Sequence, residues 1–267
     1  MKFCLSGRQP KSVLAKADEI KMEFRDSERL IDYIEDFPNT TFIIDIPKGI
    51  EADLISWDLF KAFSAKADII IGLRDLTLID NCKEHGLKFY YSLPIITWYE
   101  LDAMIKLDPC YLYVTDSLYF SLDKIKRKTD IPIRLCANLA FDPYIPRENG
   151  IYGTWIRPED VHIYEKWVDA LEFYFTSLSH EATLLEIYKE KQEWPGNLNL
   201  LLTNLNFNVN NRVIPEEIGL YRATCGHKCS EMRTCHMCEN MILFADSIRK
   251  KYYKDKKATS TPLEDEN

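Results

Sequence analysis

Eight short runs of apolar, β-branched and aromatic residues recur along the first 175 residues of this 267-residue chain. Each run has the length of a β-strand, and the segments between the runs have apolar residues at helical spacing. Strands that alternate with helices form a parallel sheet, because each helix carries the chain back to the start of the next strand. The expected strands are residues 2–6, 20–24, 41–46, 67–73, 87–93, 110–114, 131–137 and 170–175.

The segments between these runs carry start and stop signals of helices. Thr97, with Glu100 three residues later, is typical of a capping box, in which each side chain binds a free amide of the other residue. Ser27 is expected to begin the first long helix, and Gly86 is expected to end a later one. The expected helices are residues 27–37, 57–65, 76–85, 98–107, 117–128, 158–168 and 179–193.

Eight strands, each paired with a helix or a crossover segment, predict an α/β fold of the (β/α)8 barrel type over residues 1–195. A doubly wound open sheet is the alternative, since it uses the same alternation of strands and helices. No Gly-x-Gly-x-x-Gly run follows the first strand, so the sequence does not support a dinucleotide site. No apolar run is long enough to cross a bilayer, and no leader-like segment opens the chain. We therefore expect a cytoplasmic protein with no membrane partner.

Four cysteines lie close together near the C-terminus, with the spacing C-x3-C-x5-C-x2-C. They are Cys225, Cys229, Cys235 and Cys238. Converging thiolates are the ligands of tetrahedral zinc sites and of iron–sulfur clusters, and the spacing fits both. Two disulfides are a further alternative, which a cytoplasmic location disfavours. The sequence therefore predicts a small C-terminal Cys-rich metal-binding segment that follows the barrel.

The chain changes character after residue 195. Residues 196–257 are expected to form a cap that holds the four-cysteine site and a helix at 239–253 with a lysine-rich end. Residues 258–267 are polar and acidic, as in disordered tails. The basic helix end has two interpretations, a solvated terminus or a docking surface for nucleic acid or a protein partner. A net charge of −8 argues against non-specific binding of nucleic acid by the chain as a whole.

Parallel barrels place their active sites at the carboxyl ends of the strands, so polar residues near those ends form the candidate site. We expect this mouth to be lined by Asp45, Arg134, Asn138 and Glu172. A carboxylate within an apolar strand needs a partner, and the candidate partners are Arg25, Arg74 and Arg134. Arginines that converge with carboxylates indicate an anionic, carboxylate-bearing ligand, and a salt-bridge network without chemistry is the alternative. The long aromatic loop at 139–157 is expected to be a lid or a packed cover.

Part of the predicted barrel resembles a known family. Residues 156–161 (Ile-Arg-Pro-Glu-Asp-Val), followed by residues 167–173 (Trp-Val-Asp-Ala-Leu-Glu-Phe), resemble a stretch of the collagenase-like peptidase family, peptidase family U-32. In that family an arginine-bearing segment and a short acidic helix lead into a strand of Glu-x-Glu-x-Phe type, whose second glutamate Glu172 matches. Residues 112–116 and 131–138 resemble the two barrel strands that precede it.

The resemblance implies a (β/α)8-type barrel and the activities of that family, which includes collagenase-like peptidases, RNA-hydroxylation factors and oxygen-independent hydroxylases with an iron–sulfur cluster. The family's His-Gly-Ala-x-Cys-like run is replaced here by Thr-Ser-Leu-Ser-His at residues 176–180, so its ligand assignments do not transfer. Together with the four cysteines, the resemblance predicts an iron–sulfur-dependent enzyme of redox or hydroxylation type, acting on RNA or a small carboxylate substrate. The alternatives are a zinc-stabilised binding module for nucleic acid or protein, and a peptidase.

Overall fold

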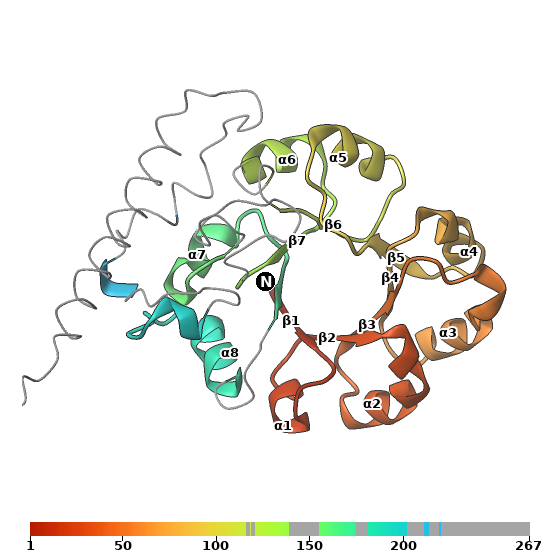
Figure 1. Cartoon of the computed structure of the whole chain (residues 1–267), viewed down its shortest axis with the longest axis horizontal. Coiled ribbons are helices and arrows are strands. Elements are labelled where there is room, and N and C mark those ends of the chain that lie inside the picture. Colours follow the sequence, from red (N-terminus) through yellow and green to blue (C-terminus); the bar gives the residue numbers. More distant parts are fainter. Residues whose placement is uncertain are drawn as a thin grey trace, which may run out of the picture.

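Eight parallel strands arranged as a ring form the centre of the molecule. The computed structural model describes residues 1–115, 118, 121–138, 155–174, 181–201, 211–213 and 219. The strand order is β5-β4-β3-β2-β1-β8-β7-β6, and each paired neighbour runs parallel. Figure 1 shows the strands around a central axis with the helices outside them. The strands are β1 (Lys2–Ser6), β2 (Glu19–Glu23), β3 (Thr41–Ile46), β4 (Ile69–Leu73), β5 (Lys88–Tyr91), β6 (Leu112–Tyr113), β7 (Ile133–Cys136) and β8 (Ala170–Phe173).

A helix follows each strand along the chain, and several begin with a short 3-10 turn. The α-helices are α1 (Lys11–Leu14), α2 (Leu30–Asp36), α3 (Trp57–Ser64), α4 (Ile79–Glu84), α5 (Trp98–Ile105), α6 (Leu122–Lys128), α7 (Val161–Tyr164) and α8 (Glu181–Glu190). The 3-10 turns are η1 (Phe24–Arg29), η2 (Ala52–Leu54), η3 (Leu76–Leu78), η5 (Pro158–Asp160), η6 (Leu198–Leu200) and η7 (Asn211–Val213).

The seam between β5 and β6 closes through residues beyond the ends of these strands. Ile95 forms an isolated parallel bridge with Val114, and its amide donates to the carbonyl of Tyr113 at 2.7 Å. At the other end of the seam, the amide of Cys110 donates to the carbonyl of Phe89 at 2.8 Å. The ring is therefore nearly closed. This confirms the predicted (β/α)8 barrel and excludes the open doubly wound sheet.

The sequence patterns located the elements well, with two exceptions. The capping box of α5 is present, since Thr97 accepts from the amide of Glu100 at 3.1 Å, and Gly86 ends α4 with a φ of 68°. Ser27 does not begin a helix: it lies inside η1, and α2 begins at Leu30. The short helix α1 was not predicted, because four residues are too few to show a helical period.

Two cores lie on the two sides of the sheet. The larger one packs the outward faces of the strands against the helices, and the smaller one fills the barrel with residues that include Cys4, Ile70 and Tyr113. The barrel interior also holds buried charged residues, namely Glu19, Asp45, Arg134 and Glu172. An unpaired charge in such a place is costly, so the pairing of these groups decides how the interior is built.

Several predicted features lie outside the described residues. These are the four cysteines, the basic helix at 239–253, the tail, and most of the loop at 139–157. Within the described ranges, no helix has both the length and the apolar character that crossing a membrane requires.

Candidate functional site

The carboxyl ends of β1, β2, β3, β4 and β8 surround a cavity of about 320 Å³. This is the end of a parallel barrel at which active sites are built. We call this cavity and its rim the mouth. Its lining comprises Ser6, Arg8, Gln9, Lys21, Met22, Glu23, Asp45, Arg74, Glu172, Phe173 and Tyr174.

Strand periodicity explains why charged groups gather here. Successive side chains of a strand point to opposite faces, so alternate residues of β2 face the barrel interior. The parallel register then places Ser6 of β1 beside Lys21 of β2, and Glu172 of β8 beside Cys4 of β1. Polar side chains from three adjacent strands therefore meet near the end of the barrel.

Three ion pairs line the mouth. Lys21 Nζ lies 2.9 Å from Glu172 Oε1, Arg74 Nη2 lies 2.7 Å from Asp45 Oδ2, and Arg8 pairs with Glu23 at 2.7 Å. In the first two pairs the carboxylate is the more deeply buried partner, with exposed fractions of 2% for Glu172 and 5% for Asp45. The cations Lys21 and Arg74 are 13% and 44% exposed. Buried carboxylates thus hold cations in the cavity wall.

Glu172 is an ionised anchor. Its Oε1 accepts hydrogen bonds from Lys21 and, at 2.6 Å, from the hydroxyl of Tyr174, while Oε2 lies 3.6 Å from Arg134 Nη1. Burial alone would raise the pKa of this carboxyl, but Lys21, Arg134 and the Tyr174 hydroxyl together lower it below its usual value. Glu172 therefore stays negative at neutral pH and does not act as a proton donor in this state.

Lys21 is a cation held at the base of the mouth. Burial would lower its pKa, but the charges of Glu172 and Asp45 outweigh that effect and raise it. The amine is therefore protonated at neutral pH and supplies a positive charge. Across the described part of the chain, Glu172 is the one hydrogen-bond partner of this ammonium. An ammonium carries three N–H donors, so donors remain for a ligand.

Arg134 lies deeper than the mouth. It is fully buried, pairs with Glu19, and its guanidinium lies over the ring of Tyr111 at 4.5 Å and that of Tyr90 at 5.3 Å. Tyr111 also donates its hydroxyl to Glu19 at 2.9 Å. Arg134 does not line the cavity, so its contact with the mouth is through Glu172.

Asn138 binds the backbone at the end of β8. Its side-chain amide donates to the carbonyl of Tyr174 at 2.6 Å, and its side-chain oxygen accepts from the amide of Tyr174 at 2.8 Å. These two bonds tie the end of β7 to the end of β8 and fix the backbone that carries Tyr174. Asn138 is thus placed to position a mouth residue rather than to contact a ligand in the cavity.

The expected ion pairs can be compared with those observed. Asp45 pairs with Arg74 and Glu172 with Arg134, which are two of the combinations considered from the sequence. Arg25 instead pairs with Glu23, at 2.7 Å. Lys21 and Tyr174 were not predicted as site residues. Lys21 alternates with apolar neighbours in the run 20–24. This pattern predicts that Lys21 and its neighbours lie on opposite faces of the strand, but it does not tell which face points into the barrel.

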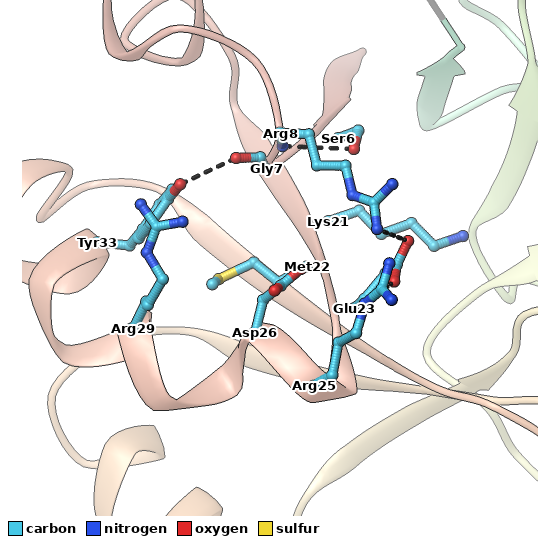
Figure 2. Close-up of a pocket in the computed structure, with 10 residues that line it drawn as sticks. All are labelled: Ser6, Gly7, Arg8, Lys21, Met22, Glu23, Arg25, Asp26, Arg29 and Tyr33. Carbon is cyan, nitrogen blue, oxygen red and sulfur yellow. Dashed lines mark hydrogen bonds and ion pairs between the residues drawn. The ribbon is translucent and has the colours of Figure 1, made fainter.

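A second, smaller cavity of about 160 Å³ adjoins the mouth, and five residues line both: Ser6, Arg8, Lys21, Met22 and Glu23. Figure 2 shows Arg8 and Arg25 approaching Glu23, with Arg29 next to Tyr33 on the opposite wall. The guanidinium of Arg29 lies 5.4 Å from the centre of the Tyr33 ring. These arginines add positive charge beside the mouth.

No group of His, Cys, Asp and Glu side chains within the described ranges is arranged to hold a metal ion. The four-cysteine segment lies outside those ranges, so its fit to a metal rests on its donor set and spacing. Four thiolates suit zinc or an iron–sulfur cluster.

Comparisons with known proteins add little to this description. No family model and no curated protein matches the chain. Among solved structures, the tryptophan synthase complex from Pyrococcus furiosus matches with 11% identity and a TM-score of 0.48, covering 72% of this chain and 90% of that one. Tryptophan synthase subunit alpha from Legionella pneumophila gives 14% identity, a TM-score of 0.46, and coverage of 71% and 92%. The barrel assignment rests on the strand order itself.

Proposed function

We propose that this chain is an enzyme whose active site is the barrel mouth and whose substrate is a small molecule that carries a carboxylate. The observation that carries the proposal is Lys21, a partly buried ammonium that lines the cavity, is held by Glu172, and has N–H donors beyond that contact. Such a group binds an anion strongly, because it is already desolvated and oriented before the ligand arrives.

The rest of the mouth supports a small ligand. A cavity of about 320 Å³ is at the lower end of the range of small-molecule sites. Arg8 and Arg74 stand at the rim as further cations. The carboxylates of Glu23 and Asp45 alternate with these cations, so the described residues of the rim form no continuous basic track of the kind that binds a nucleic-acid backbone. Of the two substrate classes expected from the sequence, the small carboxylate is the better supported.

We further propose that the four-cysteine segment holds a metal centre and that an iron–sulfur cluster there supplies redox chemistry to the enzyme. The spacing of the four thiolates supports a metal, and the resemblance to peptidase family U-32 favours iron–sulfur over zinc. A closed four-thiolate zinc site would instead stabilise the C-terminal region and do no chemistry itself. In that case a binding role for nucleic acid or protein becomes the function of that region.

A ligand panel tests the proposal. Small mono-, di- and tricarboxylates are titrated into the full-length protein at low salt by calorimetry, with the corresponding neutral amides as controls. The expected result is binding by one or more carboxylates and none by their amides. Arg74→Gln should weaken binding, and Arg127→Gln, an exposed residue of α6, should not. Equal binding of acids and amides, or no binding by any acid, would overturn the assignment.

A further inference from the structure

The smaller cavity beside the mouth has a surplus of positive charge, although the chain as a whole carries a net charge of −8. Its volume is about 160 Å³, and its charged lining consists of four cations and two carboxylates. The cations are Arg8, Lys21, Arg25 and Arg29, and the carboxylates are Glu23 and Asp26. An anion that enters this cavity therefore meets more attraction than repulsion.

Two of the arginines share one anionic partner. Glu23 lies between them, with Oε1 at 2.7 Å from Arg8 Nη2 and Oε2 at 2.7 Å from Arg25 Nε. One carboxylate thus compensates two guanidinium groups. A guanidinium has five N–H donors, so both arginines keep donors for a further anion.

Arg29 lies on the opposite wall of the cavity, next to Tyr33 (Figure 2). Its guanidinium lies 5.4 Å from the centre of the Tyr33 ring, and it makes no ion pair with any of the described residues. Tyr33 is buried and donates its hydroxyl to the carbonyl of Gly7 at 2.9 Å, so its ring is fixed. The contact with this ring orients Arg29 before a ligand arrives. An anion in the cavity would lie between Arg29 and the other two arginines.

One ligand can reach both cavities, because five residues from β1, β2 and the turn after β1 line both of them. Arg25 and Arg29 line the smaller cavity and not the mouth, whereas Arg74 lines the mouth and not the smaller cavity. Substitutions can therefore address one cavity at a time.

We propose that the smaller cavity binds a phosphate group of the substrate, so that the substrate is a phosphorylated carboxylic acid. This rests on the proposed function, in which Lys21 binds the carboxylate in the mouth. A phosphate monoester has a charge of about −1.5 to −2 at neutral pH and three terminal oxygens, and guanidinium groups bind such oxygens in pairs. Three guanidinium groups around one cavity suit this group better than a second carboxylate, which has one charge and two oxygens.

The test uses four acids with the same carbon chain: propionate, ethylphosphonate, succinate and 3-phosphonopropionate. They carry a carboxylate alone, a phosphonate alone, two carboxylates, and one group of each kind. Each is titrated by calorimetry into the full-length wild-type protein at low salt, where exposed charges are least screened. The set with one more carbon is titrated in the same way, namely butyrate, propylphosphonate, glutarate and 4-phosphonobutyrate. In at least one set, the acid with both groups is expected to bind roughly tenfold tighter or more than the other three.

Three variants change the charge of the smaller cavity alone. Arg25 and Arg29 are exposed, so Arg25→Gln and Arg29→Gln are expected to retain the fold. Each should weaken binding of the phosphonocarboxylate roughly three- to tenfold and leave the plain monocarboxylate within about twofold. Asp26→Asn should strengthen binding of the phosphonocarboxylate, because it removes a like charge from the cavity. The control Arg127→Gln, an exposed residue of α6, should change none of these affinities.

The outcomes separate this proposal from the proposed function. Equal affinity of phosphonocarboxylates and dicarboxylates in both sets would overturn the phosphate assignment and leave the mouth as an anion site. A phosphonate preference that survives Arg25→Gln and Arg29→Gln together would overturn the smaller cavity as its place. An alkylphosphonate that binds as tightly as the phosphonocarboxylate in both sets would overturn the substrate with two groups, because the carboxylate would add nothing, and the proposed function would fail with it. If none of the acids binds, both proposals fail.

Discussion

Replacing Arg134 by methionine tests whether the centre of the barrel is a structural ion pair. Arg134 and Glu19 are both fully buried and paired with each other. Removing one member of such a pair leaves the other charge without its partner in a desolvated place, which typically costs about 3–5 kcal/mol. Glu19 keeps a contact with Lys2 at 3.3 Å and the hydroxyl of Tyr111. We therefore expect Arg134→Met to lower the free energy of unfolding by about 3 kcal/mol, the lower end of that range.

The double variant Glu19→Gln, Arg134→Met removes both charges. The amide oxygen at position 19 can still accept from Tyr111, and Glu172, the other carboxylate beside Arg134, keeps its bonds from Lys21 and Tyr174, so the expected loss is only about 1 kcal/mol. The free energy of unfolding is measured by urea titration at neutral pH, followed by tryptophan fluorescence. The control is Arg127→Met, whose side chain is 81% exposed on α6 and which should unfold as the wild type does.

Two results would refute this reasoning. One is a loss of less than about 1 kcal/mol in Arg134→Met, which would mean that the pair contributes nothing of the expected size. The other is a double variant whose loss of unfolding free energy equals the sum of the losses in Glu19→Gln and Arg134→Met alone, because the effects of removing two members of an ion pair are not additive.

Three further predictions follow from the buried charges and the thiols. The pKa of Glu172 is lowered from its usual 4.5, so its stabilisation is present above that pH and is lost as the pH falls further. The stability difference between wild type and Glu172→Gln should therefore narrow in urea titrations as the pH falls below 4.5, and a constant difference would contradict the assignment. Burial raises the pKa of three thiols to about 12: those of Cys4, Cys82 and Cys110. We therefore expect iodoacetamide at neutral pH to leave these thiols unmodified in the native protein, which peptide mapping after the reaction checks. Protein purified without oxygen should contain iron and sulfide and absorb broadly near about 400 nm, whereas stoichiometric zinc and no colour would make the four-cysteine segment structural.

Much of the fold was predictable because its signals are local. Each strand is a short apolar run, and the alternation with helices leaves few arrangements of the sheet. The capping box at Thr97 could be read directly, since both of its partners lie within one helical turn. The start of α2 could not be predicted from the sequence, because the chain first forms the 3-10 turn η1, and Ser27 is one residue of that turn. The closure of the seam by Ile95 depends on contacts distant in sequence and has no local signal.

The site was predictable in part for the same reason. Asp45 and Glu172 stood out as carboxylates inside apolar strands, and the structure places both in the mouth. Arg134 stood out in the same way, but a strand residue can lie at any depth in a barrel, and the sequence does not give that depth. Lys21 was missed because a lysine in an alternating strand has the pattern of a surface residue.

The close approach of neighbouring side chains to Gly72 had no signal in the sequence. A glycine in a strand is uninformative until its neighbours on the adjacent strands are known, and Asp45 and Ser92 come from β3 and from the residue after β5. The register of β3, β4 and β5 brings these positions together. Only the assembled sheet shows that these side chains meet beside Gly72.

The most direct test of the proposed mouth is the affinity of the tightest carboxylate of the panel for Lys21→Met and Lys21→Arg, measured by calorimetry beside the wild type. A hydrogen bond to a charged group contributes about 1.5–3 kcal/mol. Lys21→Met should therefore weaken binding by about 10- to 150-fold, and Lys21→Arg, which keeps the charge, should weaken it much less. Circular dichroism of both variants must match that of the wild type. Unchanged affinity in folded Lys21→Met would contradict the central claim that this ammonium binds the substrate carboxylate.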